Sequence, residues 1–251
     1  MSSWSKRRKS SYALIVIIVM IGAIGVPVFL HVYKAPTCFD GYMNGNEQGV
    51  DCGGSCQRLC ASAFLPPKVA WTRFEQVAPG LYNLAAYIIN PNTEGEALSV
   101  PYHMATYDNK GILITDHVGR VTLPPHRNTL AFQSAVSTGK RIPEKILFEF
   151  TVAPDWHKRV DPLSALIIAD KKYSEDESGS SLSVTIRNSR VQPVNAFSVY
   201  SVLYDAAGNA LGFSKTLVDG IPSQGNVIAP FTWPIRREDK VISIEVLPVA
   251  E

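Results

Sequence analysis

The most constraining feature of the sequence is an apolar run near its N-terminus. The 22 residues from Tyr12 to Tyr33 carry no charge except a possible one on His31. A helix of this length rises roughly 33 Å, which is enough to cross the hydrocarbon of a bilayer. The sequence therefore predicts one transmembrane helix over 12–33, with membrane lipid as a partner and a tyrosine at each interface.

The basic residues around this run predict its orientation. The stretch KRRK, from Lys6 to Lys9, precedes the run, whereas only Lys34 closely follows it. Because basic residues favour the cytoplasmic side, we expect residues 1–11 to form a cytoplasmic tail and everything after Tyr33 to be extracytoplasmic.

A cleaved signal peptide is the alternative interpretation of the run. Its apolar core spans about 7 to 15 residues and precedes a small-x-small cleavage site. The observed run is longer, and Pro36 and Thr37 suit a lipoprotein signal before Cys38 poorly. An uncleaved anchor is therefore expected. The sequence holds no N-x-S/T glycosylation site, which favours a prokaryotic cell envelope.

The net charge argues against a nucleic-acid partner. It is +2, and the 24 Lys and Arg residues are spread along the chain apart from the N-terminal cluster. Phosphate binding needs a clustered basic face. We therefore expect protein or cell-envelope partners instead, and the sequence leaves the oligomeric state open.

The segment 37–60 contains all four cysteines. They are Cys38, Cys52, Cys56 and Cys60. Their C-x13-C-x3-C-x3-C spacing matches neither the paired C-x2-C of zinc sites nor the C-x-x-C of redox motifs. Outside the cytoplasm an even number of cysteines predicts disulfides, and three pairings remain open.

The same segment resembles a recurrent short cysteine-rich motif. The residues that carry the resemblance are Cys38, Asp40-Gly41, Asn44-Gly45, Glu47, Gly49-Val50-Asp51-Cys52-Gly53-Gly54 and Cys56. The motif, C-x-D-G-x2-N-G-x-E-x-G-V-D-C-G-G-x-C, occurs beside modular domains of secreted and surface proteins. The resemblance implies an extracytoplasmic spacer or small disulfide module without catalytic activity.

Four oxygen-bearing residues of this segment form a weak candidate calcium site. They are Asp40, Asn44, Glu47 and Asp51. Calcium takes 6 to 8 oxygen ligands, but this spacing does not fit an EF-hand loop. Asx turns, in which these side chains bond nearby backbone, are the competing interpretation. No cofactor is therefore expected, with calcium as the alternative.

An internal repeat organises the rest of the chain. The stretch from Asn83 aligns with that from Ser181 at an offset of 97 to 98 residues, and Asn90 matches Asn188. Apolar residues alternate at period two, as half-buried strands require, and turn residues recur every 8 to 12 positions. The pattern predicts two antiparallel β-sandwiches of about seven strands each, at 66–153 and 161–249.

Two connecting segments carry further expectations. The linker over 153–162 contains Trp156, which we expect to wedge between the two domains. The stretch KYSEDESGSS, from Lys172, predicts a mobile polar loop, because it offers no apolar residues that could pack.

The second copy resembles the FxLYD-type immunoglobulin-like domain of bacteria and archaea. The resemblance lies in Val184 to Asn188, VLYDAAGNALG from Val202, and IPSQGNVIAPF from Ile221. The first copy departs from it at Thr106, in ATYDNKGILI. The resemblance implies a mainly β fold of two immunoglobulin-like sandwiches, behind the transmembrane helix and the disulfide-closed segment. It implies no chemistry.

Two aspartates each precede a glycine by three residues in this repeat. The pairs are Asp108 with Gly111 and Asp205 with Gly208. Asp suits the first position of a type I turn and Gly the fourth, so we expect hairpin turns in preference to metal ligands.

Other candidate catalytic residues lack a supporting pattern. Four histidines after the anchor could ligate a metal or act as a base beside Asp116, but no H-x-x-x-H or H-x-H spacing joins them; they are His103, His117, His126 and His157. Ser137 to Lys140 matches S-x-x-K formally, without the S-D-N or K-T-G of penicillin-recognising enzymes.

The sequence thus predicts a membrane-anchored, non-enzymatic binding, adhesion or envelope-assembly protein. Loops on a sandwich scaffold supply recognition surfaces in such proteins. The alternative is a calcium- or zinc-dependent extracytoplasmic enzyme or factor that uses the acidic cysteine segment or the histidines. A structural subunit of an envelope complex is a third possibility.

Overall fold

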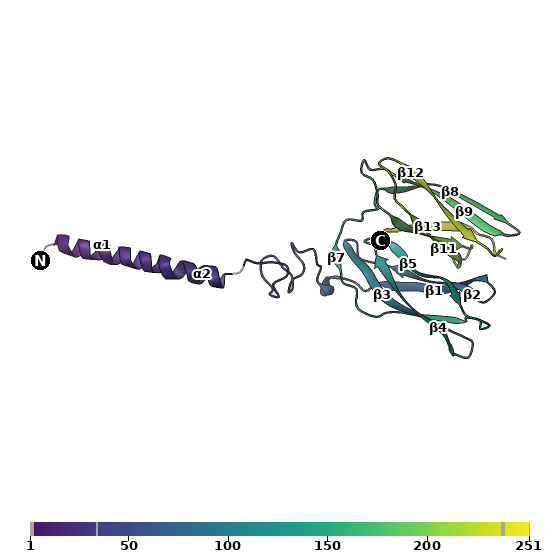
Figure 1. Ribbon diagram of the computed structural model, residues 1–251, viewed down its shortest axis with the longest axis horizontal. Coiled ribbons are helices and arrows are strands. Elements are labelled where there is room, and N and C mark those ends of the chain that lie inside the picture. The colour runs from purple at the N-terminus through teal and green to yellow at the C-terminus, as the bar shows by residue number, and fades with distance from the viewer. Residues whose placement is uncertain (1–2, 34, 237–238, 251) are drawn as a thin grey trace. The chain divides into compact units, whose positions relative to one another are not determined.

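The computed structural model describes residues 3–33, 35–236 and 239–250 (Figure 1). Met1 and Ser2 of the predicted cytoplasmic tail, Lys34 after the predicted helix, and residues 237–238 of the predicted second sandwich lie outside these ranges. The chain divides into two compact units, Met1–Cys56 and Gln57–Glu251, and each is described by itself.

The first unit begins with a continuous helix. It comprises α1 (Ser3–Met20), a π-helical turn η1 (Ile21–Gly25) and α2 (Val26–Val32). The window Lys9–His31 has a mean hydropathy of 2.9 and no buried residue, so it is long and apolar enough to span a membrane. The helix begins at Ser3, nine residues before the predicted membrane span, and includes the polar residues of the predicted tail.

Pro27 explains the π-helical turn. Proline lacks an N–H group and its ring crowds the carbonyl one turn earlier. The wider turn η1 ends immediately before the Val26-Pro27 start of α2. A π turn at this position relieves the crowding without ending the helix.

The cysteine segment folds as a series of tight turns closed by disulfides. Cys38 and Cys56 are bonded to each other with an S–S distance of 2.02 Å, which selects one of the open pairings. Cys52 and Cys60 are disulfide-bonded as well, so two disulfides are present as predicted. Gly54 has a φ of +58° and a Cβ there would lie 1.7 Å from the Asn46 carbonyl oxygen, so this turn requires glycine.

The second unit contains four antiparallel sheets, so the mainly β prediction is confirmed. The first two sheets have the strand orders β1-β2-β5 and β4-β3-β6, and β7 also pairs with β3. The bounds are β1 (Lys68–Ala78), β2 (Leu81–Ile89), β3 (Gly95–Tyr107), β4 (Leu113–Leu123), β5 (Asn128–Ser137), β6 (Lys145–Phe150) and β7 (His157–Lys158), after a short 3-10 helix η2 (Ala61–Ala63). One buried apolar cluster joins these two sheets into the first sandwich.

The other two sheets have the orders β12-β9-β8 and β11-β10-β13. Their bounds are β8 (Leu166–Asp176), β9 (Gly179–Asn188), β10 (Phe197–Tyr204), β11 (Ala210–Val218), β12 (Asn226–Trp233) and β13 (Ser243–Ala250). A second apolar cluster joins them into the second sandwich. Counting strands in chain order, its two sheets have the same order as those of the first sandwich.

Two buried asparagines make matching contacts in the two sandwiches. The Asn90 amide donates to the carbonyl oxygens of Gly95 and Pro124, at 2.9 and 2.7 Å. The Asn188 amide donates to those of Gln192 and Pro222, at 2.8 and 3.1 Å. Each asparagine thereby fixes the loop that follows its own strand and a later loop of the same sandwich.

The two sandwiches pack through the outer faces of the sheets that contain β2 and β10. A third apolar cluster covers both faces: Ala85, Tyr87 and Leu130 from the first sandwich, and Tyr200, Val202, Phe213, Leu247 and Val249 from the second. Strands β2 and β10 are therefore buried on both faces along most of their length. The half-buried alternation predicted for them is wrong, because the other sandwich replaces solvent on the second face.

Two local predictions are also wrong. Trp156 is 5% exposed within the core of the first sandwich and stacks on Phe64 at a ring-centroid distance of 5.4 Å, so it is no wedge between domains. The polar stretch from Lys172 forms the turn end of the β8–β9 hairpin. Its Tyr173 packs against the second core and pairs with Leu182 on the opposite strand.

We predict that Phe213→Ala destabilises the second unit by about 3–5 kcal/mol, because it leaves a cavity in the contact between the sandwiches. Phe213 is 1% exposed, and its ring lies 6.1 Å from that of Phe132 in the first sandwich. Urea denaturation of the full chain in detergent micelles measures the change. Leu217→Ala, on the same strand at 55% exposure, is the control and should cost less than about 0.5 kcal/mol. Equal destabilisation by Phe213→Ala and Leu217→Ala would contradict the packing of Phe213 between the two sandwiches.

A second prediction concerns tyrosines that meet one carboxylate at this contact. The Glu245 carboxylate accepts hydrogen bonds from the hydroxyls of Tyr87 and Tyr204, at 2.8 and 2.9 Å. Burial, reinforced by Glu245, raises the pKa of both tyrosines. In the unfolded chain a tyrosine hydroxyl titrates at about pH 10, so the unfolded state releases these hydroxyl protons before the folded state as the pH rises.

We therefore expect the free energy of unfolding to fall above about pH 10, by up to about 1.4 kcal/mol per pH unit for each tyrosine. Tyr87→Phe should remove one such contribution and flatten the slope between about pH 10 and 11. Urea denaturation of the full chain across this range measures it. Tyr42→Phe, at a position 70% exposed, is the control. If the pH dependence of the unfolding free energy is the same in Tyr87→Phe and in the parent chain, the Tyr87 hydroxyl ionises alike in the folded and unfolded states.

Candidate functional site

The predicted turn residues lie at the tips of two equivalent hairpins, β3–β4 and β10–β11. The Gly111 N–H donates to the Asp108 carbonyl oxygen at 3.0 Å, and the Gly208 N–H to that of Asp205 at 3.3 Å. Both glycines have a φ near +75°, at +73° and +80°. The Asp108 carboxylate accepts the N–H of Ile112, a bond that lowers the pKa of Asp108.

Three of the four candidate calcium ligands accept hydrogen bonds from backbone N–H groups, and the fourth, Asn44, donates its side-chain amide to Asp40 at 3.0 Å. Asp40 accepts hydrogen bonds from the N–H groups of Thr37 and Tyr42, Glu47 from that of Asn44, and Asp51 from that of Gly41. The contact of Asp40 with Tyr42 is that of an Asx turn, whereas the Asp51 contact joins residues ten apart in the sequence.

Two cysteine sulfurs lie near one of these carboxylates. Cys38, Glu47 and Cys56 bring their ligand atoms within 4.8 Å of one another. However, both sulfurs belong to the Cys38–Cys56 disulfide, and metal ligation by cysteine requires a free thiolate. The cluster in its oxidised form therefore does not fit a zinc site.

The histidines do not converge. Nδ1 of His103 lies 3.3 Å from the Asp116 carboxylate across the exposed face of β3 and β4. Nε2 of His157 lies 3.2 Å from Asp155 in the linker. His126 is exposed in the β4–β5 loop, and His117 is partly buried on β4. Each pair or residue is a separate surface feature.

The S-x-x-K stretch does not adopt the helical geometry that its chemistry requires. Ser137 ends β5 and the next residues form a turn, in which the Arg141 N–H donates to the Thr138 carbonyl oxygen at 3.2 Å. Lys140 therefore does not follow Ser137 on one helical face.

The second unit also contains a groove that the sequence did not predict. We call it the junction groove. It has a volume of about 600 Å³ and is lined by Thr93, Glu94, Pro125, His126, Arg127, Lys158, Arg159, Val160, Asp161 and Ser164. Loops of the first sandwich form one side, and the segment that leads into β8 forms the other.

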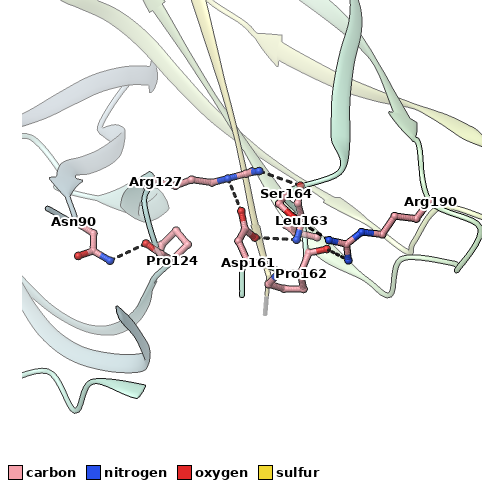
Figure 2. A network of polar contacts seen from close by, with 8 residues as sticks. All are labelled: Asn90, Pro124, Arg127, Asp161, Pro162, Leu163, Ser164 and Arg190. Carbon is pink, nitrogen blue, oxygen red and sulfur yellow. Dashed lines mark hydrogen bonds and ion pairs between the residues drawn. The ribbon is translucent and has the colours of Figure 1, made fainter. Parts of the chain in front are cut away.

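Ion pairs hold the charged walls of the junction groove. Figure 2 shows the centre of this network, where Nε of Arg127 lies 2.6 Å from the Asp161 carboxylate. The same guanidinium donates to the Leu163 carbonyl oxygen at 3.0 Å. Asp161 also accepts the Leu163 N–H at 2.8 Å, which makes a closed turn of the connecting segment.

A second arginine ties this segment to the second sandwich. Arg190, which follows β9, donates to the Pro162 carbonyl oxygen at 3.3 Å and to the Ser164 hydroxyl at 2.8 Å (Figure 2). The connecting segment is thus bonded to arginines from both sandwiches, and the groove wall is fixed in place.

One buried carboxylate lies behind the junction groove. Glu96 is 1% exposed, and its Oε2 accepts a hydrogen bond from Arg159 at 2.8 Å. Its Oε1 makes no hydrogen bond to the residues that the structure describes. Burial raises the pKa of Glu96, and the facing Arg159 opposes that shift.

The donor set of the groove suits binding. Arg127, Lys158 and Arg159 face Glu94 and Asp161, with the hydroxyls of Thr93 and Ser164 beside them. Such a set recognises a polar ligand by charge-assisted hydrogen bonds. The sequence signal for the site is the density of charge in WHKRVD, residues 156–161, although by itself this stretch predicts only a linker.

Comparisons with known proteins assign no family to the chain. No protein-family model matches it, and no curated protein matches it significantly. Among solved structures, it is similar to the N-terminal CBM22-1–CBM22-2 tandem domain of Xyn10C from Paenibacillus barcinonensis, at 10% sequence identity. The match covers 74% of this chain and 86% of that one, with a TM-score of 0.15, a value too low to support any inference about ligands.

We predict that Arg127 and Asp161 are energetically coupled. Their side chains are only 26% and 14% exposed, so water screens the pair weakly. A double-mutant cycle of Arg127→Gln and Asp161→Asn, measured by urea denaturation, should give a coupling energy of about 1–3 kcal/mol. The control is the Lys172–Asp170 pair, which is 80% and 50% exposed, and about 0–1 kcal/mol is expected there. Equal coupling in both cycles would contradict a structural role of Asp161 in the groove.

Proposed function

We propose that this chain is a single-pass membrane protein that displays its two sandwiches outside the cytoplasm as a non-enzymatic binding module. In this proposal the N-terminus is cytoplasmic and the junction groove binds a polar ligand or partner of the cell envelope. The observation that carries the proposal is the groove itself, because charged side chains from separate loops are held around one recess by ion pairs and packing.

The anchor and the disulfides support the extracytoplasmic location. A helix over Lys9–His31 follows the basic stretch that starts at Lys6, and disulfides persist in oxidising compartments. The turns of the cysteine segment would then act as a covalently closed spacer between the membrane and the sandwiches. Disulfide closure suits so short a segment, which has little apolar surface to bury.

The contact between the sandwiches supports binding at the junction. A recess between two independently moving domains loses its shape, and ordering it on binding costs affinity. Here the apolar cluster around Tyr87 and Phe213 packs one sandwich on the other, and Arg127 and Arg190 fix the connecting segment. The groove is therefore preorganised for a ligand.

Lysine labelling tests the orientation. A membrane-impermeant amine reagent added to intact cells should modify Lys172, which is 80% exposed on the second sandwich. Lys6 and Lys9, in the tail, should be modified only after permeabilisation. Mass spectrometry of the full chain reads both sites in one sample, so each serves as the control for the other. The reverse pattern would contradict the proposed topology.

Site-specific crosslinking tests the binding site. A photoreactive amino acid replaces Val160, which lines the groove and is 83% exposed, in the full chain in native membranes. The same replacement of Ile228, which is 63% exposed on β12, is the control. We expect a discrete crosslinked product at Val160 and not at Ile228. Equal products at the two positions, or none at Val160, would contradict binding in the groove.

A further inference from the structure

One end of the first sandwich combines exposed aliphatic and basic side chains. It is built from the β3–β4 hairpin and the β5–β6 loop, which lie together because the Glu144 N–H donates to the Tyr107 carbonyl oxygen at 2.8 Å. Arg141 of the loop also donates to the Leu113 carbonyl oxygen at 3.1 Å. We call this surface the basic tip, and its members are Lys110, Ile112, Leu113, Lys140, Arg141, Ile142 and Lys145.

Three aliphatic side chains of the basic tip are exposed to solvent. Ile142 is 71% exposed, Ile112 49% and Leu113 48%. Single exposed apolar residues are ordinary, but three on two adjoining loops form a patch that gains free energy when it is covered.

The loops do not allow these side chains to fold back into the core. The Asp108 carboxylate accepts the N–H groups of both Lys110 and Ile112, each at 2.9 Å, which fixes the hairpin. Pro143, next to Ile142, is buried and anchors the loop on the other side. The aliphatic groups are thus presented outward by local structure.

Four cations surround the aliphatic patch. Lys110, Lys140, Arg141 and Lys145 are all exposed, and none forms an ion pair with the residues that the structure describes. The nearby acids are Asp108, whose carboxylate is engaged with the hairpin backbone, and Glu144. The tip therefore carries an excess of positive charge, four cations against two carboxylates.

The second sandwich repeats this composition in the equivalent loop. The Ile242 N–H donates to the Tyr204 carbonyl oxygen at 2.8 Å, as the Glu144 N–H does to that of Tyr107. Ile235 and Ile242 are 40% and 57% exposed there. Arg236, Asp239 and Lys240 lie exposed between them in the sequence.

We propose that the basic tip docks on an anionic lipid surface. Aliphatic side chains enter the boundary between headgroups and acyl chains, while lysines and arginines around them contact phosphate-bearing headgroups. Charge complementarity selects this occupant, because a neutral apolar partner would leave four cations desolvated or unpaired at the rim. The interaction is separate from the junction groove and from the transmembrane helix.

Vesicle flotation tests the docking with the full chain. The protein is held in nanodiscs of neutral phosphatidylcholine, so that its helix is already inserted. The nanodiscs are then mixed with vesicles of phosphatidylcholine alone or with about 30% phosphatidylglycerol. We expect the protein to float with the anionic vesicles only, and to be released by ~0.5 M salt, which shortens the screening length to a few ångströms.

Variants of the tip identify the surface responsible. Lys110→Gln and Lys140→Gln should each weaken flotation about fivefold, as expected for one basic residue near an anionic surface. Ile142→Ser should weaken it about tenfold or more, by removing one aliphatic anchor. Lys172→Gln and Val191→Ser, at positions 80% and 74% exposed outside the tip, are the matched controls and should bind like the parent chain.

Three results would overturn the proposal. They are equal flotation with neutral and anionic vesicles, no flotation with either, and tip variants that bind like the parent chain. Circular dichroism and urea denaturation of each variant ensure that a lost interaction does not reflect a lost fold. Because all five positions are exposed, their substitution should change stability by less than about 0.5 kcal/mol.

Discussion

The arrangement of the second unit depends on the apolar contact between the sheets containing β2 and β10. Tyr87 and Leu130 from one sandwich meet Val202 and Phe213 from the other, and all are buried. This contact turns what would be solvent-facing positions into core. It also makes the sandwiches neighbours along a broad face, so that their connecting segment crosses a short distance and can be bonded on both sides.

The contact is specified by differences between the two copies. The outward positions of β2 include Ala85 and Tyr87, whereas the aligned positions of β9, Ser183 and Thr185, are polar and not buried. Burying small and aromatic side chains against another apolar sheet lowers the free energy. Burying hydroxyl groups there would raise it, because they would lose their hydrogen bonds to water. The two sandwiches share a strand order, but only the outer faces of the sheets containing β2 and β10 are apolar enough to pack on each other. The other outer faces stay in solvent.

The junction groove and the basic tip show how one scaffold separates two kinds of surface. In the groove, cations are matched by Glu94, Glu96 and Asp161, which limits net charge and favours directional hydrogen bonding. At the tip, cations surround aliphatic groups without such pairing among the described residues, which favours a diffuse anionic surface. The carboxylate of Asp108 is bonded to the turn backbone and forms no ion pair among the described residues, although the charges of Lys110 and Arg141 stabilise it.

The sequence by itself determined the features that local patterns encode. These are the membrane-length helix, the oxidised cysteines and the mainly β fold of short alternating strands, because each follows from composition or spacing within a few residues. Only the tertiary structure decided the Cys38–Cys56 pairing, the second buried face of β2 and the junction groove. Arg127 and Leu163 lie 36 residues apart, and their contact exists because two sandwiches pack. Alternation marks which positions share a face, but burial of the opposite face depends on a distant segment that no local pattern identifies.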